Sequence, residues 1–235
     1  FVEIKPNQKI SIQKVDGYSD KVYISDNASI KPRALHTINL HTQRALEQWG
    51  IPLERKPKIV IVSPDELPTA YGKYDAITNT VYYIPQIVDK KVVEKLGDVE
   101  YHEMWHMRQA ENFRKKHGEI IRENYGKYIE YSCQKAKNVI DQAGIDRYNV
   151  GEISDYAKQM YNRQRYDEVE AEYMVANRKK VWSVAFRRYP EEIEKLFKIC
   201  EPYEDRVENG ELKDAPPEVI EAFEKTKKWA WEQEQ

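Results

Sequence analysis

The sequence has few of the residues that form disulfide frameworks in small secreted domains, and it lacks long apolar segments that could span a membrane. Among its 235 residues are only two cysteines, Cys133 and Cys200, and they form no C-x-x-C pair. Two such cysteines exclude a disulfide framework and a cysteine-rich zinc site, so we expect free buried thiols, with one bridge between them as the alternative. No run of about 18 apolar residues occurs, so no segment is predicted to span a membrane.

An excess of charge of one sign is also absent. The 38 Lys and Arg nearly balance the 40 Asp and Glu, and the formal net charge is -2. This balance gives no electrostatic case for nucleic acid or an anionic membrane as a partner. With a mean hydropathy of -0.84, the chain is predicted to be soluble. The sequence begins with Phe1, and its first residues do not resemble a signal peptide. We therefore expect that position 1 was produced by cleavage, or that the chain is part of a larger polypeptide or assembly. The sequence does not indicate a cellular compartment.

The first half of the chain mixes strand and helix patterns. Short alternating apolar runs and a β-branched run bounded by prolines are typical of strands, whereas Leu35, Ile38 and Leu46 recur at helical spacing. Pro32 suits the first turn of that helix and Gly50 its end. The expected elements are a small hairpin or irregular strands in 1–30, a helix at 32–49, a strand at 58–63 and a hairpin over 71–85.

Beyond Asp89 the strand signals nearly vanish. Apolar residues at helical spacing predict a helix from Asp89 to Gly118, interrupted at Gly97-Asp98. The pattern favours one α+β domain over 1–235, with an α/β part at 1–88 and a helical part at 89–235. Further helices are expected at about 119–143, 152–182, 190–200 and 216–233.

One motif with chemical meaning lies within the helix predicted after Asp89. Residues 102–106 read His102-Glu103-Met104-Trp105-His106, an H-E-x-x-H sequence. Positions four apart share a helix face, so both imidazoles can reach one metal ion while Glu103 points beside it. A catalytic zinc takes three protein ligands and keeps a fourth position for water. The other histidines are expected to be solvent-facing or structural: His36, His41 and His117.

A carboxylate is therefore the natural third ligand. Glu168 and Glu172, four apart on a predicted helix, share one face. Two like charges at this spacing repel each other unless a cation lies between them or a partner absorbs the charge. The ordinary alternative is an acidic solvent face that Arg165 and Arg178 balance.

The pair of motifs, His102-Glu103-x-x-His106 and Glu168-x-x-Ala171-Glu172, resembles the gluzincin branch of zinc metallopeptidases. The resemblance implies a zincin-like α+β fold with a small sheet before a mainly helical half. It implies that zinc is held by His102, His106 and Glu168, and that Glu172, in place of the commoner aspartate, supports a ligating histidine. It further implies that Glu103 is the general base when zinc-bound water hydrolyses a peptide or protein substrate.

The hairpin over 71–85 resembles the strand that forms the upper wall of the gluzincin cleft and can pair with an extended substrate. A second electrophile is expected to stabilise the charge that develops on the carbonyl oxygen. Charged Glu100 and Arg108, and the long separation of Glu168 from His106, depart from the family's pattern. The tyrosines nearest the inferred cleft are Tyr71, Tyr74, Tyr161 and Tyr166.

The stretches 101–116 and 165–178 also resemble the metallopeptidase-like domain of some minor head proteins of firmicute phages. This resemblance leaves a second class of function open, a catalytically weak or inactive zincin-fold module that binds a partner or helps assemble a particle. A third interpretation is a coincidental motif in a metal-free helical protein. Glu103 favours catalysis, because a structural zinc site needs ligands but no base.

Overall fold

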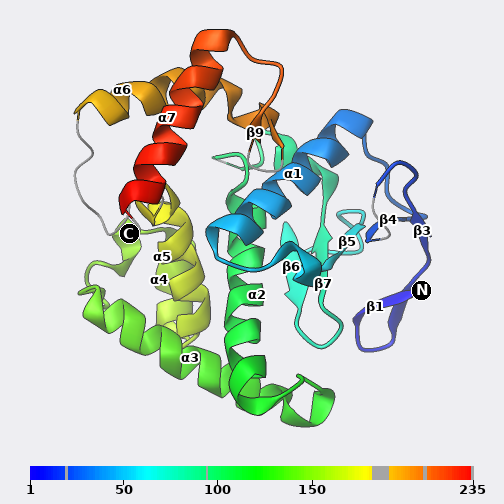
Figure 1. Cartoon of the computed structure of the whole chain (residues 1–235). Helices are drawn as coiled ribbons and strands as arrows, with labels where there is room; N and C mark the ends of the chain where they lie inside the picture. The colour runs from blue at the N-terminus through cyan, green and yellow to red at the C-terminus, as the bar shows by residue number, and fades with distance from the viewer. Residues whose placement is uncertain (19–20, 94, 182–190, 209–210, 234–235) are drawn as a thin grey trace. The chain divides into compact units, whose positions relative to one another are not determined.

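The computed structural model describes residues 1–18, 21–93, 95–181, 191–208 and 211–233 (Figure 1). Packing divides the chain into two compact units, 1–176 and 177–235, and each unit is described by itself. A single domain over the whole chain stays a prediction. The predicted α+β class is confirmed, because β1 to β7 all lie before residue 84 and the described part beyond residue 97 is mainly helical.

The largest sheet has five strands in the order β3-β4-β5-β7-β6. The three central strands, β4, β5 and β7, run parallel, and each edge strand pairs antiparallel with its neighbour. Ile59, Val60 and Ile61 of β5 are fully buried, as the β-branched run predicts. The bounds are β3 (Ile12–Lys14), β4 (Val22–Ser25), β5 (Lys58–Ile61), β6 (Gly72–Asp75) and β7 (Thr80–Tyr83).

A separate hairpin precedes the sheet and is tied to it. Strands β1 (Val2–Lys5) and β2 (Gln8–Ile10) pair antiparallel. The ammonium of Lys73, on β6, donates a hydrogen bond to the carbonyl of Ile4 at 2.6 Å. The hairpin expected within residues 1–30 corresponds to β3-β4, and β1-β2 is an additional hairpin that the sequence did not predict.

Two helices, α1 (Pro32–Gln48) and α2 (Asp98–His117), pack against each other and against the sheet (Figure 1). Thr42 Oγ1 of α1 lies 3.1 Å from the hydroxyl of Tyr83 on β7, and both residues are buried. On β6, a Cβ at Gly72 would lie 2.8 Å from Cγ1 of Val99 on α2. Glycine at this position therefore lets the edge strand approach the helix closely.

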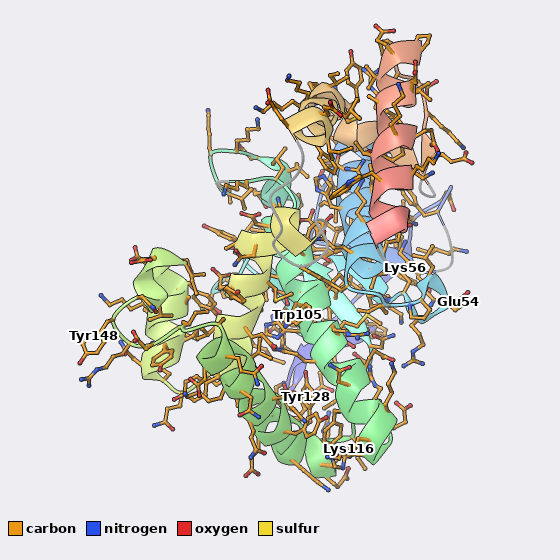
Figure 2. The ribbon with its side chains drawn as sticks, turned by 60° about the vertical axis from the view of Figure 1, so that its left-hand side comes forward. Glu54, Lys56, Trp105, Lys116, Tyr128 and Tyr148 are labelled. Atoms are coloured by element: carbon orange, nitrogen blue, oxygen red, sulfur yellow. The ribbon has the colours of Figure 1, made fainter. Side chains whose placement is uncertain are left out.

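Helix α2 begins later than the sequence predicts. Asp89 does not cap a helix: its carboxylate accepts the amide hydrogen of Lys91 at 2.8 Å, and the chain turns there. The helix begins after Gly97, whose φ of 89° is left-handed, and ends at Gly118, whose φ is 81°. Its first turn is acidic and its last turn basic, which complements the helix dipole. Figure 2 shows Trp105 midway along α2 and Lys116 near its carboxyl end.

Two of the predicted helices are corrected in the same unit. The helix expected from 119 is α3 (Tyr125–Gln142), because a 3-10 turn at Arg122–Asn124 precedes it. The helix expected over 152–182 is two helices, α4 (Asp155–Asn162) and α5 (Tyr166–Val181). They are separated where Gln164 takes a left-handed φ of 59°. Buried residues of α3, α4 and α5 form one cluster that includes Ile140, Ala157, Met160 and Val169.

The second unit contains a helical pair that was predicted nearly to the residue. Helices α6 (Glu191–Cys200) and α7 (Pro217–Gln233) pack together, with strands β8 (Val207–Glu208) and β9 (Glu211–Leu212) between them in sequence. Cys200 is buried, Cys133 in the first unit is half-buried, and both are free thiols. No helix in the described ranges is long and apolar enough to cross a membrane.

The break between α4 and α5 gives a test of the fold. Gln164 is exposed and left-handed, a conformation that costs a residue with a Cβ about 1 kcal/mol. Gln164→Gly should therefore raise the free energy of unfolding by about 0.5 to 1 kcal/mol in urea denaturation. The matched change at exposed Gln159, inside α4, should lower it by about 1 kcal/mol. Equal destabilisation at the two sites would contradict the left-handed assignment.

Candidate metal centre

Two histidines of α2 and one glutamate of α5 meet at a single point. His102 Nε2 lies 3.1 Å from His106 Nε2. Oε2 of Glu168 lies 3.1 Å from the first of these nitrogens and 3.2 Å from the second. The structure thus brings together the three residues that the motif pair suggested, although they come from helices far apart in the sequence.

The triangle formed by these three atoms has the size that one small metal ion requires. Zinc binds nitrogen and oxygen ligands at about 2.0 to 2.2 Å, which places neighbouring ligand atoms of a tetrahedron about 3.3 Å apart. Two imidazole nitrogens and a carboxylate oxygen that face one another also need a proton or a cation between them. His102, His106 and Glu168 could therefore hold a metal ion.

His102 is oriented from behind by a carboxylate. Its Nδ1 lies 2.8 Å from Oε1 of Glu172, the distance of a hydrogen bond from the ring N–H to the carboxylate. That bond fixes the tautomer in which the Nε2 lone pair faces the site. Oε2 of Glu172 accepts a second hydrogen bond, from the hydroxyl of Ser154, at 2.7 Å. Glu172 thus occupies the place that the gluzincin resemblance implies for it.

His106 is oriented by a side-chain amide. Its Nδ1 lies 2.9 Å from Oε1 of Gln109, one helical turn further along α2. Nε2 of Gln109 donates to Oε2 of Glu170 at 2.7 Å and to the carbonyl of Asp167 at 3.0 Å, so the amide can point only one way. The indole of Trp105 donates to the same oxygen of Glu170 at 3.1 Å.

Sequence reasoning missed Gln109 and Glu170. The spacing of three residues after His106 is a signal that could have found Gln109, because residues three apart lie on one helix face. No local signal marks Glu170. It is buried, and burial raises its pKa above the ordinary value, while hydrogen bonds from Gln109 and Trp105 oppose the shift.

The ligand oxygen of Glu168 has two further contacts. The hydroxyl of Tyr156, on α4, donates to Oε2 at 3.1 Å. Arg165 donates to the other carboxylate oxygen at 3.2 Å and holds Asp167 through two hydrogen bonds of 2.9 and 2.7 Å. Glu168 therefore faces the histidines, and its side chain is largely buried. The alternative is wrong in making this residue part of a solvent face, but the ion pair with Arg165 that it expected is present.

Tyr156 is not among the tyrosines considered from sequence. The hydroxyl of Tyr74 donates instead to Asn79 at 2.8 Å. Tyr161 and Tyr166 pack against each other with ring centroids 5.4 Å apart, in contact with the core cluster of α3, α4 and α5. Tyr156 was missed because the break between α4 and α5 has no glycine or proline to mark it, so one helix was predicted where there are two.

Glu103 lies beside the three candidate ligands and under the edge strand. Its Oε2 accepts the backbone amide hydrogen of Tyr74, on β6, at 2.8 Å. Burial raises the pKa of Glu103, while the neighbouring imidazoles of His102 and His106 lower it, and the net change is upward. A carboxylate that holds a proton more readily than usual, next to a metal site, suits general base chemistry.

The remaining histidines have the ordinary roles that were expected. His36 is exposed. Nδ1 of His41 lies 3.3 Å from Oε1 of Glu100 in a buried pair between α1 and α2, which accounts for a charged residue near the motif. The ring of His117 lies tilted against Phe113 and meets Tyr131 edge-on.

Comparison of the chain with protein-family models, with curated proteins and with solved structures found no match. The gluzincin and phage head-protein resemblances therefore stay predictions, and the assignment of a metal centre rests on the geometry of these side chains.

The ligand set predicts a specific loss of metal affinity. Glu168→Ala removes a direct ligand and should weaken zinc binding more than about 100-fold, beyond the 10- to 100-fold range typical of supporting residues. Glu170→Ala should fall within that range, because it releases Gln109 from behind His106. Exposed Glu130 on α3 gives the matched control, and Glu130→Ala should leave affinity unchanged. Competition with a chromophoric chelator measures all three, and equal affinity of the Glu168 and Glu130 variants would exclude this centre.

The protonation of the metal-free site predicts how binding depends on pH. Burial lowers the pKa of His106, but the charge and hydrogen bond of Glu168 raise it more, to about 9. Hydrogen bonds to Glu168 and Glu172 likewise overcome burial and raise the pKa of His102. A metal needs the lone pairs, so zinc uptake at pH 7 should release between about one and two protons, and affinity should rise from about pH 6.5 to 9.

Calorimetry in buffers of different ionisation enthalpy counts these protons, and a count near zero would contradict the raised pKa values. The same shifts stabilise the metal-free fold below the unfolded histidine pKa of about 6.5. That stability should disappear as the pH rises through the folded value.

Proposed function

We propose that this chain is a zinc-dependent metallopeptidase that hydrolyses peptide bonds, with His102, His106 and Glu168 as the zinc ligands. The observation that carries the proposal is the position of Glu103. It is a buried carboxylate one residue from a candidate ligand, and it is held by the backbone of β6. A site that served only to bind a metal would need the ligands but no base.

The choice of zinc follows from the chemistry of the donor set. Two imidazoles and one carboxylate are a common ligand set of catalytic zinc in hydrolases, and they leave one tetrahedral position for water. When bound, zinc supplies a Lewis acid that polarises a carbonyl and brings the pKa of a bound water near neutrality. The carboxylate of Glu172 and the amide of Gln109, behind the two imidazoles, keep both rings directed at the ion.

Glu103 and Tyr156 supply the proton chemistry. Glu103 accepts a proton from the attacking water and passes it to the leaving nitrogen. Burial and the charge of Glu168 raise the pKa of Tyr156, so its hydroxyl keeps its proton at neutral pH. That hydroxyl donates to the ligand oxygen of Glu168 at 3.1 Å, and it would turn from this oxygen to the substrate carbonyl oxygen as negative charge develops there.

A peptide is favoured as the substrate because a strand edge lies at the site. Among the described residues, strand β6 lies at the edge of its sheet with β7 as its hydrogen-bonded neighbour there. Its contact with Glu103 brings this edge to the base. An extended peptide along β6 would receive backbone hydrogen bonds that do not depend on its side chains. The scissile bond would then lie between Glu103 and Tyr156.

Removal of the base should separate binding from catalysis. Glu103→Gln keeps an oxygen for the Tyr74 amide and touches no ligand, so zinc affinity should change less than about threefold. Loss of a general base costs about 10²- to 10⁴-fold, so cleavage of a mixed peptide library should fall by about 10³-fold. Glu130→Gln, at an exposed position on α3, is the matched control and should retain activity.

Undiminished cleavage by the Glu103 variant would contradict the mechanism. A wild-type protein that binds zinc and cleaves no peptide in the library would favour the alternative, a zinc-binding module that serves in partner binding or assembly. Activity that survives complete chelation of the metal would contradict both.

A further inference from the structure

Glu172 has two hydrogen-bond partners on two different helices. One oxygen holds the Nδ1 of His102 on α2 at 2.8 Å, and the other accepts from the hydroxyl of Ser154 at 2.7 Å. Ser154 is the N-cap residue of α4, and its Oγ also accepts the amide hydrogen of Ala157 at 2.9 Å. Because that hydroxyl already accepts from Ala157, its single hydrogen is directed at Glu172.

The first turn of α4 therefore touches the metal centre at two points. Ser154 reaches His102 through Glu172, and Tyr156, two residues later, reaches Oε2 of Glu168. Helix α4 has only eight residues, too few to be stable by itself, so contacts with its surroundings must fix its position. Ala157 and Met160 bury it in the cluster shared with α3 and α5.

We propose that Ser154 is a positioning residue for the hydrolysis: by binding Glu172 it fixes the first turn of α4 and so places the Tyr156 hydroxyl at the reacting carbonyl. This inference rests on the proposed function. It also gives a reason for a glutamate at position 172. The carboxylate has to bridge an imidazole on α2 and a hydroxyl on α4, and the extra methylene lengthens its reach beyond that of the commoner aspartate.

Two substitutions test the role of the Ser154 hydroxyl, which makes both the hydrogen bond to Glu172 and the side-chain cap of α4. Ser154→Gly removes the hydroxyl but leaves a residue that N-cap positions accept, so α4 should persist. Ser154→Thr keeps the hydroxyl and the cap and is the conservative rescue. We expect the glycine variant to lower kcat about tenfold with KM within about twofold, and the threonine variant to stay within about twofold of wild type in both.

A double-mutant cycle tests whether Ser154 acts through Tyr156. Tyr156→Phe alone should lower kcat by about 100-fold, the loss of one oxyanion donor. If Ser154 serves to place that hydroxyl, the Ser154→Gly and Tyr156→Phe double variant should be no slower than Tyr156→Phe. Multiplied losses in the double variant would overturn the proposal, as would a threonine variant as impaired as the glycine variant.

Hydrogen exchange in α4 tests the role of Ser154 without requiring that the protein cleave a peptide. Zinc that orders His102 should also order α4 through Glu172 and Ser154, because coupling between two sites is reciprocal. Zinc should therefore slow hydrogen exchange at the Lys158 amide, whose acceptor is the backbone carbonyl of Ser154 in every variant. The slowing should appear in the wild-type and threonine proteins, and much less in the glycine protein. If zinc slows exchange equally in all three, Ser154 does not link the metal to α4. If the three differ as expected but no peptide is cleaved, only the peptidase proposal fails.

Discussion

The contact between α2 and α5 at His102, His106 and Glu168 is the constraint on which the rest of the first unit depends. Three atoms with lone pairs lie within 3.2 Å of one another, in surroundings that exclude most water. Without a proton or cation between them, such a contact would be repulsive. The two helices can meet at this point because the site can take up positive charge, either as protons in the metal-free protein or as a metal ion.

The surrounding polar residues follow from the cost of burying this charge. A buried carboxylate or imidazole is tolerated only when its remaining donors and acceptors are satisfied. Glu172, Gln109 and Arg165 each satisfy one atom of the ligand set, and each is itself held by a further group. These supports come from α2, from α5 and from the turn between α4 and α5, so the centre is also a junction of the helical part of the unit. A change at the site should therefore affect both metal binding and packing.

Much of the fold could be predicted from the periodicity of apolar residues, and the errors of that prediction have local causes. Helix α1, strand β5, the β6-β7 hairpin and helices α6 and α7 appear close to their predicted places, because hydrophobic spacing, proline and glycine marked them. The start of α2 was misplaced because Asp89 makes a turn with Lys91 in place of a helix cap. The division of α4 from α5 at Gln164 was missed, since a left-handed residue other than glycine gives no signal in one sequence. Tyr156 was missed with it.

The candidate site shows the same division between local and distant information. The H-E-x-x-H motif can be recognised from the sequence because one helical turn brings its two histidines together. The four-residue spacing of Glu168 and Glu172 likewise identifies a shared face on a second helix. The resemblance to gluzincins then joined two motifs that no local rule connects. The supports Glu170 and Ser154 depend on how α2, α4 and α5 cross, and that crossing is decided by packing over long sequence separations. Single-sequence patterns do not contain it.

The zinc X-ray absorption spectrum of the metal-loaded protein tests the central claim most directly. One zinc ion per chain should show two imidazoles and one carboxylate oxygen, with nitrogen and oxygen ligands at about 2.0 to 2.2 Å and no sulfur. Multiple-scattering features of the two imidazoles should disappear together with the metal in a His102→Ala, His106→Ala variant. A sulfur ligand at about 2.3 Å, or a first shell without histidine, would contradict the assignment of this centre.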